Sequence, residues 1–406
     1  MKKKNLLFIS HRVPYPPNKG DKIRSFNILK HLSKKYNIYL ACMIDDKRDI
    51  TASQNLHTFI SGFYFDIINP FWKKIFSITA FLRSLPISVY YFYSNSVQQS
   101  IDSLLEKQHM DVIFCYSSPT AEYIFSSKHY SKLQQSLWIM DFIDLDSYKW
   151  LQYSKASSFP MSVIYRLEAK FLRRYEKRVS KEFQHIFITT EAEKALFLQQ
   201  VSLEANITPL QNGVDFHYFS PNHQTSIEKN EVYSLIFAGV MDYFPNIDGV
   251  KWFAEDIFPL ILKKIPSVTF YIVGSNPTED VKQLGQRPKI TVTGFVDDVR
   301  DYYSIADVCI VPLRIARGIQ NKVLEGMAMS KPTVCTPQAL VGIEKTSKNE
   351  LFVAESEKSF ADSVVSLLQN KLLMQEMGMQ ARKFVRNNYS WEGNLQKLDS
   401  ILSLYQ

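Results

Sequence analysis

Residues 308–335, with the sequence VCIVPLRIARGIQNKVLEGMAMSKPTVC, give the clearest indication of the fold. Two short apolar runs, 308–311 and 333–335, flank a loop with two arginines and a glycine, followed by a helix that we expect to begin near Gln320. Short apolar runs bounded by turn residues, with helical stretches between them, are typical of a parallel sheet covered by helices. The stretch therefore predicts an α/β protein.

The same alternation extends over the whole chain. Strands are predicted in two series, at 6–9, 38–43, 112–116, 137–140 and 186–188, and then at 235–238, 269–273, 290–292, 308–311 and 333–335. Helical stretches lie at 22–35, 163–183 and 246–264. Two series of similar length predict two doubly wound domains, joined within 206–231, where Pro209, Gly213 and Pro221 interrupt the pattern.

Length and composition agree with a globular protein of two domains. At about 150 residues per domain, 406 residues suffice for two or three domains. Hydrophobic residues make up 46% of the chain and charged residues 22%, which argues against a disordered chain or a polytopic membrane protein. The net charge of +8 arises in the first half, because residues 1–207 hold 28 basic and 18 acidic side chains whereas residues 208–406 hold 20 and 22. Nucleic acid, anionic lipid and a phosphorylated substrate are the partners that such a charge favours.

The cysteines and the first residues indicate a cytoplasmic protein. Cys42, Cys115, Cys309 and Cys335 are far apart in sequence among apolar neighbours, so we expect reduced thiols rather than a metal site or disulfides. The basic first residues precede an apolar run that is too short for a signal peptide, and no run approaches the ~20 apolar residues of a spanning helix.

The first candidate site is the loop at 10–21, because ligands of open α/β sheets bind outside the carboxyl ends of the strands. It holds His11, Arg12, three prolines and Gly20, and it leads into a helix whose free N–H groups can hold an anion. The alternative is a rigid loop whose polar side chains merely face water. So much conformational restriction in one place favours the functional interpretation.

The second candidate loop, 141–147, carries Asp141, Asp144 and Asp146. Spacings of three and two do not put all three carboxylates on one face, and we choose Asp144 for contact with a sugar hydroxyl or for polarising an acceptor. An N-cap role of Asp146 or Ser147 is the equal alternative. A metal site is not expected, because no histidine or further carboxylate cluster lies close by in sequence.

The third candidate loop, 314–328, runs into the helix near Gln320. A diphosphate at the start of that helix would meet backbone N–H groups, the helix dipole, Arg317 and Lys322. Glu325 lies on the same side of the helix as Lys322 and suits the two hydroxyls of a ribose; the alternative is a simple i, i+3 ion pair with Lys322. The combination favours a nucleotide diphosphate ligand.

Two further stretches concern the surface. Residues 63–93 hold eleven aromatics in 31 positions, which suits a helix in a membrane interface or, equally, a helix pair packed on the domain core. The helix at 163–183 carries basic residues between apolar ones, and a solvated helix face is its favoured interpretation.

Several segments of the second half, in their order and spacing, are similar to the retaining glycosyltransferases of family 4, which have the GT-B fold. They are NGVD at 212–215, YFSP at 218–221, YIVG at 271–274, TGFV at 293–296, KVLEGMA at 322–328 and KP at 331–332. More narrowly, SHR at 10–12 through Arg24, and PLRIARGIQNK at 312–322, resemble sugar transferases associated with exosortase and PEP-CTERM exopolysaccharide loci. That similarity covers nearly the whole chain.

The resemblance implies two Rossmann-like domains of a GT-B fold facing a cleft. Residues 1–207 would bind the acceptor and residues 208–383 the nucleotide sugar, with 384–406 packing back on the first domain. It implies transfer with retention at the anomeric carbon, without metal or another cofactor, from a nucleotide diphosphate sugar to a glycan precursor in exopolysaccharide or cell-surface polysaccharide synthesis.

The candidate loops and the resemblance together give residues for the two halves of the site. On the acceptor side these are His11, Arg12, Gly20 and Arg24, with His11 and Asp144 as the candidates for positioning the acceptor. On the donor side they are Gly239, Asn246, Gly274, Val296, Gly318, Gln320, Asn321, Lys322, Leu324 and Glu325, and Arg317, Lys322 and Glu325 would act in catalysis.

This chain departs from the family at two positions of the donor side. Family 4 enzymes usually carry a glutamate eight positions before the one that matches Glu325, where this chain has Arg317, and the usual glutamate touches the donor sugar. The family also places a basic pair on the diphosphate in the loop that is here 239–246, which has no cation. We hypothesise that Arg317 and Lys322 replace that pair.

The basic first half and the aromatic stretch predict a lipid-linked or oligosaccharide acceptor at the anionic inner face of the cytoplasmic membrane, where the protein would be peripheral, and no nucleic acid. Two other functions compete: a non-catalytic basic protein that binds nucleic acid or membrane, and a GT-B-like nucleotide-sugar epimerase. The first leaves the pattern from Arg317 to Glu325 without a purpose.

Overall fold

The computed structural model describes residues 3–229, 232–316, 318–343 and 349–405, which belong to two compact units. Unit 1 comprises Met1–Leu210 with Lys397–Gln406, and unit 2 comprises Gln211–Gln396. The sequence analysis placed 384–406 with the first domain. The structure keeps the residues up to Gln396 in unit 2, because Val385 and Tyr389 are buried in its core.

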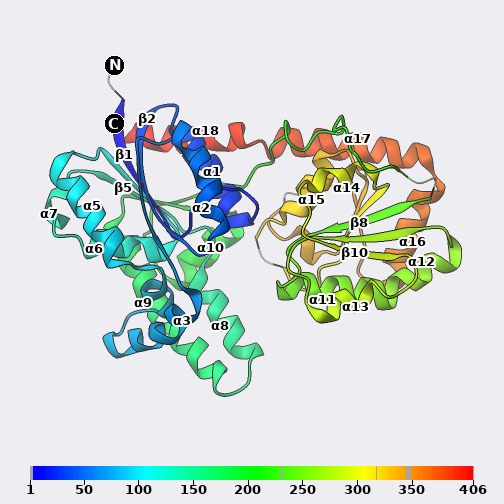
Figure 1. Cartoon of the computed structure of the whole chain (residues 1–406), viewed down its shortest axis with the longest axis horizontal. Coiled ribbons are helices and arrows are strands. Elements are labelled where there is room, and N and C mark those ends of the chain that lie inside the picture. Colours follow the sequence, from blue (N-terminus) through cyan, green and yellow to red (C-terminus); the bar gives the residue numbers. More distant parts are fainter. Residues whose placement is uncertain (1–2, 230–231, 317, 344–348, 406) are drawn as a thin grey trace. The chain divides into compact units, whose positions relative to one another are not determined.

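Unit 1 is built on a seven-stranded parallel sheet with the order β3-β2-β1-β4-β5-β6-β7 (Figure 1). The chain winds outward from β1 to β3 and then outward from β4 to β7, so the strand order reverses between β1 and β4. Most residues of β1, β4, β5 and β6 are buried, as in parallel sheets covered on both faces. The strands are β1 (Lys4–Ser10), β2 (Tyr36–Ile44), β3 (Gly62–Ile67), β4 (Val112–Tyr116), β5 (Leu137–Asp141), β6 (His185–Ile188) and β7 (Ile207–Pro209).

The helices of unit 1 begin and end at recognisable signals. Ser94 accepts hydrogen bonds from the first turn of α5, and Thr190 does the same for α10. The helical segments are α1 (Gly20–Leu32), α2 (Arg48–Ala52), η1 (Ser53–Thr58), α3 (Pro70–Ser77), η2 (Ile78–Arg83), α4 (Ile87–Phe92), α5 (Asn95–Lys107), η3 (Ser118–Ala121), α6 (Glu122–Phe125), α7 (Tyr130–Leu133), α8 (Asp146–Ala156), α9 (Met161–Glu182), α10 (Glu191–Gln200) and the end of α18 (Trp391–Leu404).

Unit 2 repeats this plan with a six-stranded parallel sheet in the order β10-β9-β8-β11-β12-β13. Here the strand order reverses between β8 and β11. Its strands are β8 (Ser234–Ala238), β9 (Thr269–Val273), β10 (Ile290–Gly294), β11 (Val308–Val311), β12 (Thr333–Cys335) and β13 (Phe352–Val353). Its helical segments are α11 (Phe244–Trp252), η4 (Phe253–Ile257), α12 (Phe258–Lys264), α13 (Glu279–Leu284), α14 (Val299–Ile305), α15 (Asn321–Ala328), η5 (Gln338–Leu340), α16 (Glu357–Gln369), α17 (Lys371–Asn388) and the start of α18.

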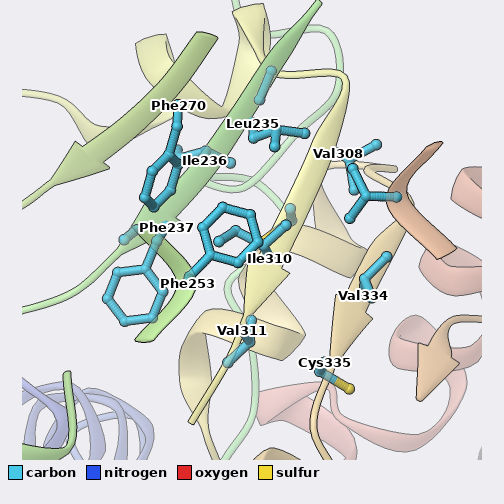
Figure 2. Close-up of a cluster of buried hydrophobic side chains, with 14 of the residues drawn as sticks. Leu235, Ile236, Phe237, Phe253, Phe270, Val308, Ile310, Val311, Val334 and Cys335 are labelled. Atoms are coloured by element: carbon cyan, nitrogen blue, oxygen red, sulfur yellow. The ribbon is translucent and has the colours of Figure 1, made fainter. Parts of the chain in front are cut away.

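The core of unit 2 lies on its central strands. Figure 2 shows side chains of β8, β9, β11 and β12 in one cluster, which includes Phe237, Phe270 and Val334. Phe253 joins it from the π-helical turn η4 and lies 4.8 Å from Phe270 between ring centroids. This packing fixes the carboxyl ends of the strands, where the predicted donor residues begin.

The predicted pair of doubly wound domains is confirmed, and each of the ten predicted strands is present. The strands β3, β7 and β13 were not predicted, because they are short or half-exposed edge strands without a continuous apolar run. The predicted helix at 246–264 is interrupted at η4, which ends two residues before Pro259, and a proline cannot donate a helical hydrogen bond.

The aromatic stretch 63–93 is not a single helix but contains β3, α3, η2 and α4. Part of it packs inward: Val89 is buried, and Tyr91, Phe92 and Tyr93 pack against the core of unit 1. Phe71, in contrast, is 66% exposed. None of the helices in the described ranges has both the length and the apolar composition needed to cross a bilayer.

Candidate active site

The carboxyl ends of β8 and β11 bring several predicted donor residues to one edge of the unit 2 sheet. Gly239 follows β8, Gly274 follows β9, and the loop after β11 leads to Lys322 on α15. Ligands of doubly wound sheets bind at the point where the strand order reverses, which in this unit lies between β8 and β11.

Gly239 and Gly274 allow the chain to pack closely at this edge. A Cβ on Gly274 would lie 1.7 Å from the Gly239 carbonyl oxygen, so only glycine fits there. A Cβ on Gly239 would lie 2.8 Å from Asn246 Nδ2 and 3.3 Å from Lys322 Cε. The Asn246 and Lys322 side chains therefore lie directly against the backbone at the end of β8.

Asn246, in the first turn of α11, is 3% exposed. Its Nδ2 donates to the Val240 carbonyl oxygen at 2.8 Å, which closes the loop between β8 and α11. Its Oδ1 is buried and, among the described residues, has no hydrogen-bond partner. Buried polar atoms are normally paired, so this oxygen is an acceptor available to a ligand or a water.

Lys322 and Glu325 face each other along α15 without forming an ion pair in the described part of the chain. Lys322 Nζ lies 5.5 Å from the centroid of the Phe237 ring, and burial lowers the pKa of Lys322 to about 8 despite the nearby Glu325 carboxylate. Burial raises the pKa of Glu325 to about 7, although Lys322 and the Tyr303 hydroxyl favour its charged form. Tyr303 Oη donates to Glu325 Oε2 at 3.4 Å, so the expected alternative of a simple Lys322–Glu325 pair is wrong.

The loop before α15 leads through Gly318 and Gln320 into the first turn of that helix. Gly318 has φ +59°, a left-handed conformation that glycine adopts without strain. Gln320 precedes the helix, and its Nε2 donates to the Gly318 carbonyl oxygen at 3.4 Å. Asn321 Oδ1 is buried without a partner among the described residues. Arg317 lies outside the described residues, so its predicted role stays a prediction.

Two predicted donor residues contribute to the core of unit 2. Leu324 has no exposed surface, and its side chain is part of the core. Val296 is half-buried and packs against the same core from the loop after β10. Arg314, in the same loop as Arg317, is exposed and pairs with Asp248 at 2.9 Å, so its charge is already balanced.

In unit 1, the loop after β1 forms a compact charged cluster around Asp21. Asp21 Oδ2 lies 3.3 Å from His11 Nε2 and 2.9 Å from Arg12 Nη1, and Arg12 Nε also lies 2.7 Å from Asp45 Oδ2. Burial opposes the charge of Asp21, but His11 and Arg12 hold its pKa well below the usual range. The His11 ring stacks on Tyr116 at 5.8 Å between centroids.

The other predicted acceptor-side residues have different environments. Gly20 is exposed at the first position of α1. Arg24 has no exposed surface, and its guanidinium binds both oxygens of Asp141, at 2.8 and 3.1 Å, and the Leu210 carbonyl oxygen at 2.6 Å. We therefore correct the predicted acceptor contact of Arg24 to a structural role, which fixes the end of β5 against Leu210, just after β7.

Asp144 is the carboxylate of its loop that is free of a cationic partner among the described residues, since Asp141 binds Arg24 and Asp146 lies 3.5 Å from Lys149. Its Oδ1 accepts from Thr189 Oγ1 at 2.9 Å, and burial raises its pKa. The preceding Ile143 has φ +70°, an uncommon conformation for a β-branched residue. Such strain persists only where the surroundings enforce it.

Three buried carboxylates enforce this loop conformation through its backbone. Asp141 Oδ1 accepts from the Ile143 N–H at 3.0 Å, Glu193 Oε2 from the Leu145 N–H at 2.9 Å, and Glu176 Oε1 from the Ser147 N–H at 3.0 Å. The side chains of Asp146 and Ser147 do not cap α8, so that alternative is wrong. Glu193 and Glu176, which are distant in sequence, instead accept from the N–H groups of Leu145 and Ser147 at the start of α8. No local sequence pattern predicts these two contacts.

Comparison with known proteins supports the fold and identifies the family model that matches within unit 2. Residues 233–370 match the family model described as Glycosyl transferases group 1. A curated relative, the capsular polysaccharide biosynthesis glycosyltransferase CapM of Staphylococcus aureus, is 25% identical over 273 residues, 63% of this chain and 68% of that protein.

Two solved structures are similar over almost the whole chain. Sucrose-phosphate synthase from Thermosynechococcus elongatus has a TM-score of 0.71 at 14% identity, covering 99% of both chains. HepE of Anabaena, solved in complex with UDP-glucose, has a TM-score of 0.66 at 12% identity, covering 98% of this chain and 99% of that one. These likenesses confirm the predicted GT-B fold.

Proposed function

We propose that this chain, which carries a Glycosyl transferases group 1 domain in a GT-B fold, transfers a sugar from a nucleotide diphosphate donor to a glycan precursor. The observation that carries the proposal is the edge formed by Gly239, Gly274, Asn246 and Lys322. A buried amide oxygen without a hydrogen-bond partner among the described residues, and a half-buried cation, both held against glycine backbone, are suited to a nucleotide diphosphate. HepE, a neighbour in fold, binds UDP-glucose.

Lys322 is proposed to neutralise the diphosphate. A cation in a water-poor site interacts with a phosphate more strongly than one at the surface. Because its pKa is lowered only to about 8, Lys322 is still mainly charged near neutral pH. The first N–H groups of α15 add the positive end of the helix dipole, and Arg317 is proposed to share this task.

Glu325 is proposed to accept hydrogen bonds from the ribose hydroxyls. Its carboxylate has one oxygen on Tyr303, which leaves the other for the donor. The pKa of about 7 means that donor binding and the charge of Glu325 are coupled.

The reaction itself is proposed to proceed with retention and without a metal, as the resemblance to family 4 implies. The bond between the anomeric carbon and the diphosphate oxygen breaks, the acceptor oxygen bonds to that carbon on the same face, and the acceptor proton passes to the leaving phosphate oxygen. No covalent protein nucleophile is required. His11 and Asp144 are proposed to orient the acceptor hydroxyl.

The acceptor is proposed to be a lipid-linked or oligosaccharide intermediate in exopolysaccharide or cell-surface polysaccharide synthesis, at the inner face of the cytoplasmic membrane. The capsular function named for CapM supports the pathway class. The excess of basic residues in 1–207 supports an anionic surface as partner.

Release of the free nucleotide tests the proposed reaction directly. The protein is incubated with a panel of UDP-, GDP- and dTDP-sugars, with and without membrane lipid extracts from a polysaccharide-producing bacterium. Transfer predicts nucleotide release that requires the extract, together with a glycosylated lipid product. Conversion of the sugar without nucleotide release would instead show an epimerase, and no consumption of any donor would contradict the proposal.

A further inference from the structure

The helices α8 and α9 form a hairpin that projects from the sheet of unit 1, with residues 157–160 at its tip (Figure 1). Its base is part of the acceptor half of the site, because α8 begins two residues after Asp144. The hairpin is held there by Glu176 of α9, which accepts from the Ser147 N–H of α8.

Large apolar side chains are exposed at the tip and along the adjacent turns of α9. Phe159 is 82% exposed, and Met161 and Val163 are 41% and 48% exposed. Tyr153 on α8 and Leu167 on α9 are exposed as well. A group of exposed apolar side chains at the end of a projecting element is rare on a monomeric protein unless it contacts something.

The charge of the same hairpin is mainly positive. Residues 146–182, from the start of α8 to the end of α9, contain nine Lys and Arg and four acidic residues. Glu168 and Glu176 are buried, and their oxygens accept from backbone N–H groups: Glu168 from those of Ile87 and Ser88, and Glu176 from that of Ser147. Asp146 and Glu182 are half-buried at the base of the hairpin, where Asp146 lies 3.5 Å from Lys149 and Glu182 accepts from the Tyr130 hydroxyl. Within 147–181, the exposed charged side chains are therefore basic.

We propose that the tip of the α8–α9 hairpin inserts into the headgroup region of an anionic membrane. Apolar side chains at the end of an element and basic side chains behind it match the boundary between lipid chains and anionic headgroups. A nucleic acid would satisfy the basic residues but leave Phe159, Met161 and Val163 in water. This proposal rests on the proposed function and identifies the surface through which its lipid-linked acceptor is reached.

The length of the hairpin sets the height of the acceptor site above the membrane. α8 has 11 residues, which span about 16 Å at the rise of an α-helix. With the tip at the headgroups, the Asp144 loop is held at that height, within reach of a diphosphate-linked sugar that projects from the bilayer. The basic side chains of α9, such as Arg166 and Lys170, then face the headgroups.

Co-sedimentation with vesicles tests the proposal on the full-length protein. Vesicles of phosphatidylcholine alone are compared with vesicles of two parts phosphatidylcholine and one part phosphatidylglycerol. Wild-type protein is expected to bind only the second kind, and more weakly as salt rises. Phe159→Ser is expected to reduce binding about tenfold, because one buried aromatic side chain is lost.

Reversal of charge provides the second variant, and other exposed residues of unit 1 provide matched controls. Arg166→Glu with Lys170→Glu is expected to lower binding at least tenfold, since each basic residue at a membrane surface contributes about fivefold. Leu203→Ser is the control for Phe159→Ser, because Leu203 is also 82% exposed. Lys107→Glu with Lys128→Glu changes the net charge equally, at exposed positions outside the hairpin.

The outcomes separate this inference from the proposed function. Loss of vesicle binding in the hairpin variants but not in the controls supports the hairpin as the membrane contact. Equal binding by all variants, binding to neutral vesicles alone, or displacement of the vesicles by single-stranded RNA overturns it. Stabilisation by nucleotide sugars is measured in parallel: if it is kept when vesicle binding fails, only the hairpin proposal fails.

Discussion

Lys322 and Glu325 lie one turn apart on α15, and burial moves their pKa values toward each other, to about 8 and about 7. Lys322 is packed against Gly239, and Glu325 is hydrogen-bonded to Tyr303 rather than to Lys322. The cation is therefore available to an anion that enters at the end of β8. Groups with opposite pKa shifts in one site are characteristic of functional positions.

Lys322→Ala is predicted to reduce turnover about 10²-fold, because the charge of the leaving diphosphate loses its half-buried partner. Arg317→Ala is predicted to do the same if both cations serve the diphosphate. Lys251→Ala is the control, since Lys251 lies on α11 in the same unit, is partly exposed and is paired with Asp280. Turnover is measured as the release of free nucleotide. Rates close to wild type for both Lys322→Ala and Arg317→Ala would contradict the hypothesis that Arg317 and Lys322 replace the usual basic pair.

The affinity for a nucleoside diphosphate is predicted to fall as the pH rises above about 8. Lys322 has a lowered pKa, so it loses its proton through that range, and neutral Lys322 no longer attracts the diphosphate. Lys322→Arg keeps its charge at every accessible pH and is predicted to remove the decline. The measurement is a calorimetric titration with UDP between pH 7 and pH 9.5; a decline that persists unchanged in Lys322→Arg argues for another titrating group.

Gly274→Ala is predicted to destabilise unit 2 by about 3 kcal/mol, because its Cβ would meet the Gly239 carbonyl oxygen, which is backbone and cannot rotate away. Gly294→Ala is the control. Gly294 also has a positive φ, +71°, but no atom lies within 4 Å of the position of a Cβ there. Gly294→Ala is therefore predicted to lower the free energy of unfolding only by the ~1 kcal/mol of the backbone strain. Urea unfolding measures both, and equal costs would show that close approach does not matter at Gly274.

Glu176→Gln is predicted to become more stabilising, relative to wild type, as the pH rises from about 5 to 8. Burial raises the pKa of Glu176 in the folded state to about 8, so between the unfolded value and 8 the folded state binds more protons, and wild-type stability falls with rising pH. Glutamine keeps the acceptor for the Ser147 N–H and does not titrate. We expect a difference of about 2 kcal/mol across this range, after allowance for relaxation around the buried group.

The control for this prediction is Glu191→Gln, which changes the charge of an exposed side chain in the first turn of α10. Chemical denaturation at several pH values gives the comparison. A stability difference between wild type and Glu176→Gln that does not change with pH would show that Glu176 is ionised in the folded protein.

The sequence predicted those parts of the fold and site that depend on local patterns. Continuous apolar runs such as 308–311 mark central strands because both faces of the sheet are covered. Lys322 was predicted from the loop that leads into its helix, Gly239 and Asn246 were predicted with the resemblance, and the structure brings the three together. The edge strand β3 was not predicted, because its residues are half-exposed and do not form a buried apolar run.

Partners that are distant in sequence could not be predicted. Asp141 with Arg24, and Glu176 with Ser147, are joined only by the packing of helices on the sheet. Because these partners could not be predicted, Arg24 was expected to contact the acceptor. In the structure Arg24 is buried and is hydrogen-bonded to Asp141 and to the Leu210 carbonyl oxygen. A single sequence shows which residue types are present but not which of them are neutralised in the folded state.

The most direct test of the account is the shift in thermal unfolding temperature with a panel of nucleotide sugars, measured for wild type, Lys322→Ala and the control Lys251→Ala. A ligand at 100 times its dissociation constant stabilises a protein by ~2.7 kcal/mol. We predict that at least one nucleotide diphosphate sugar raises the unfolding temperature of wild type and Lys251→Ala, and that the shift is largely lost in Lys322→Ala. No shift with any nucleotide sugar, or an equal shift in all three proteins, would contradict the donor site at the end of β8.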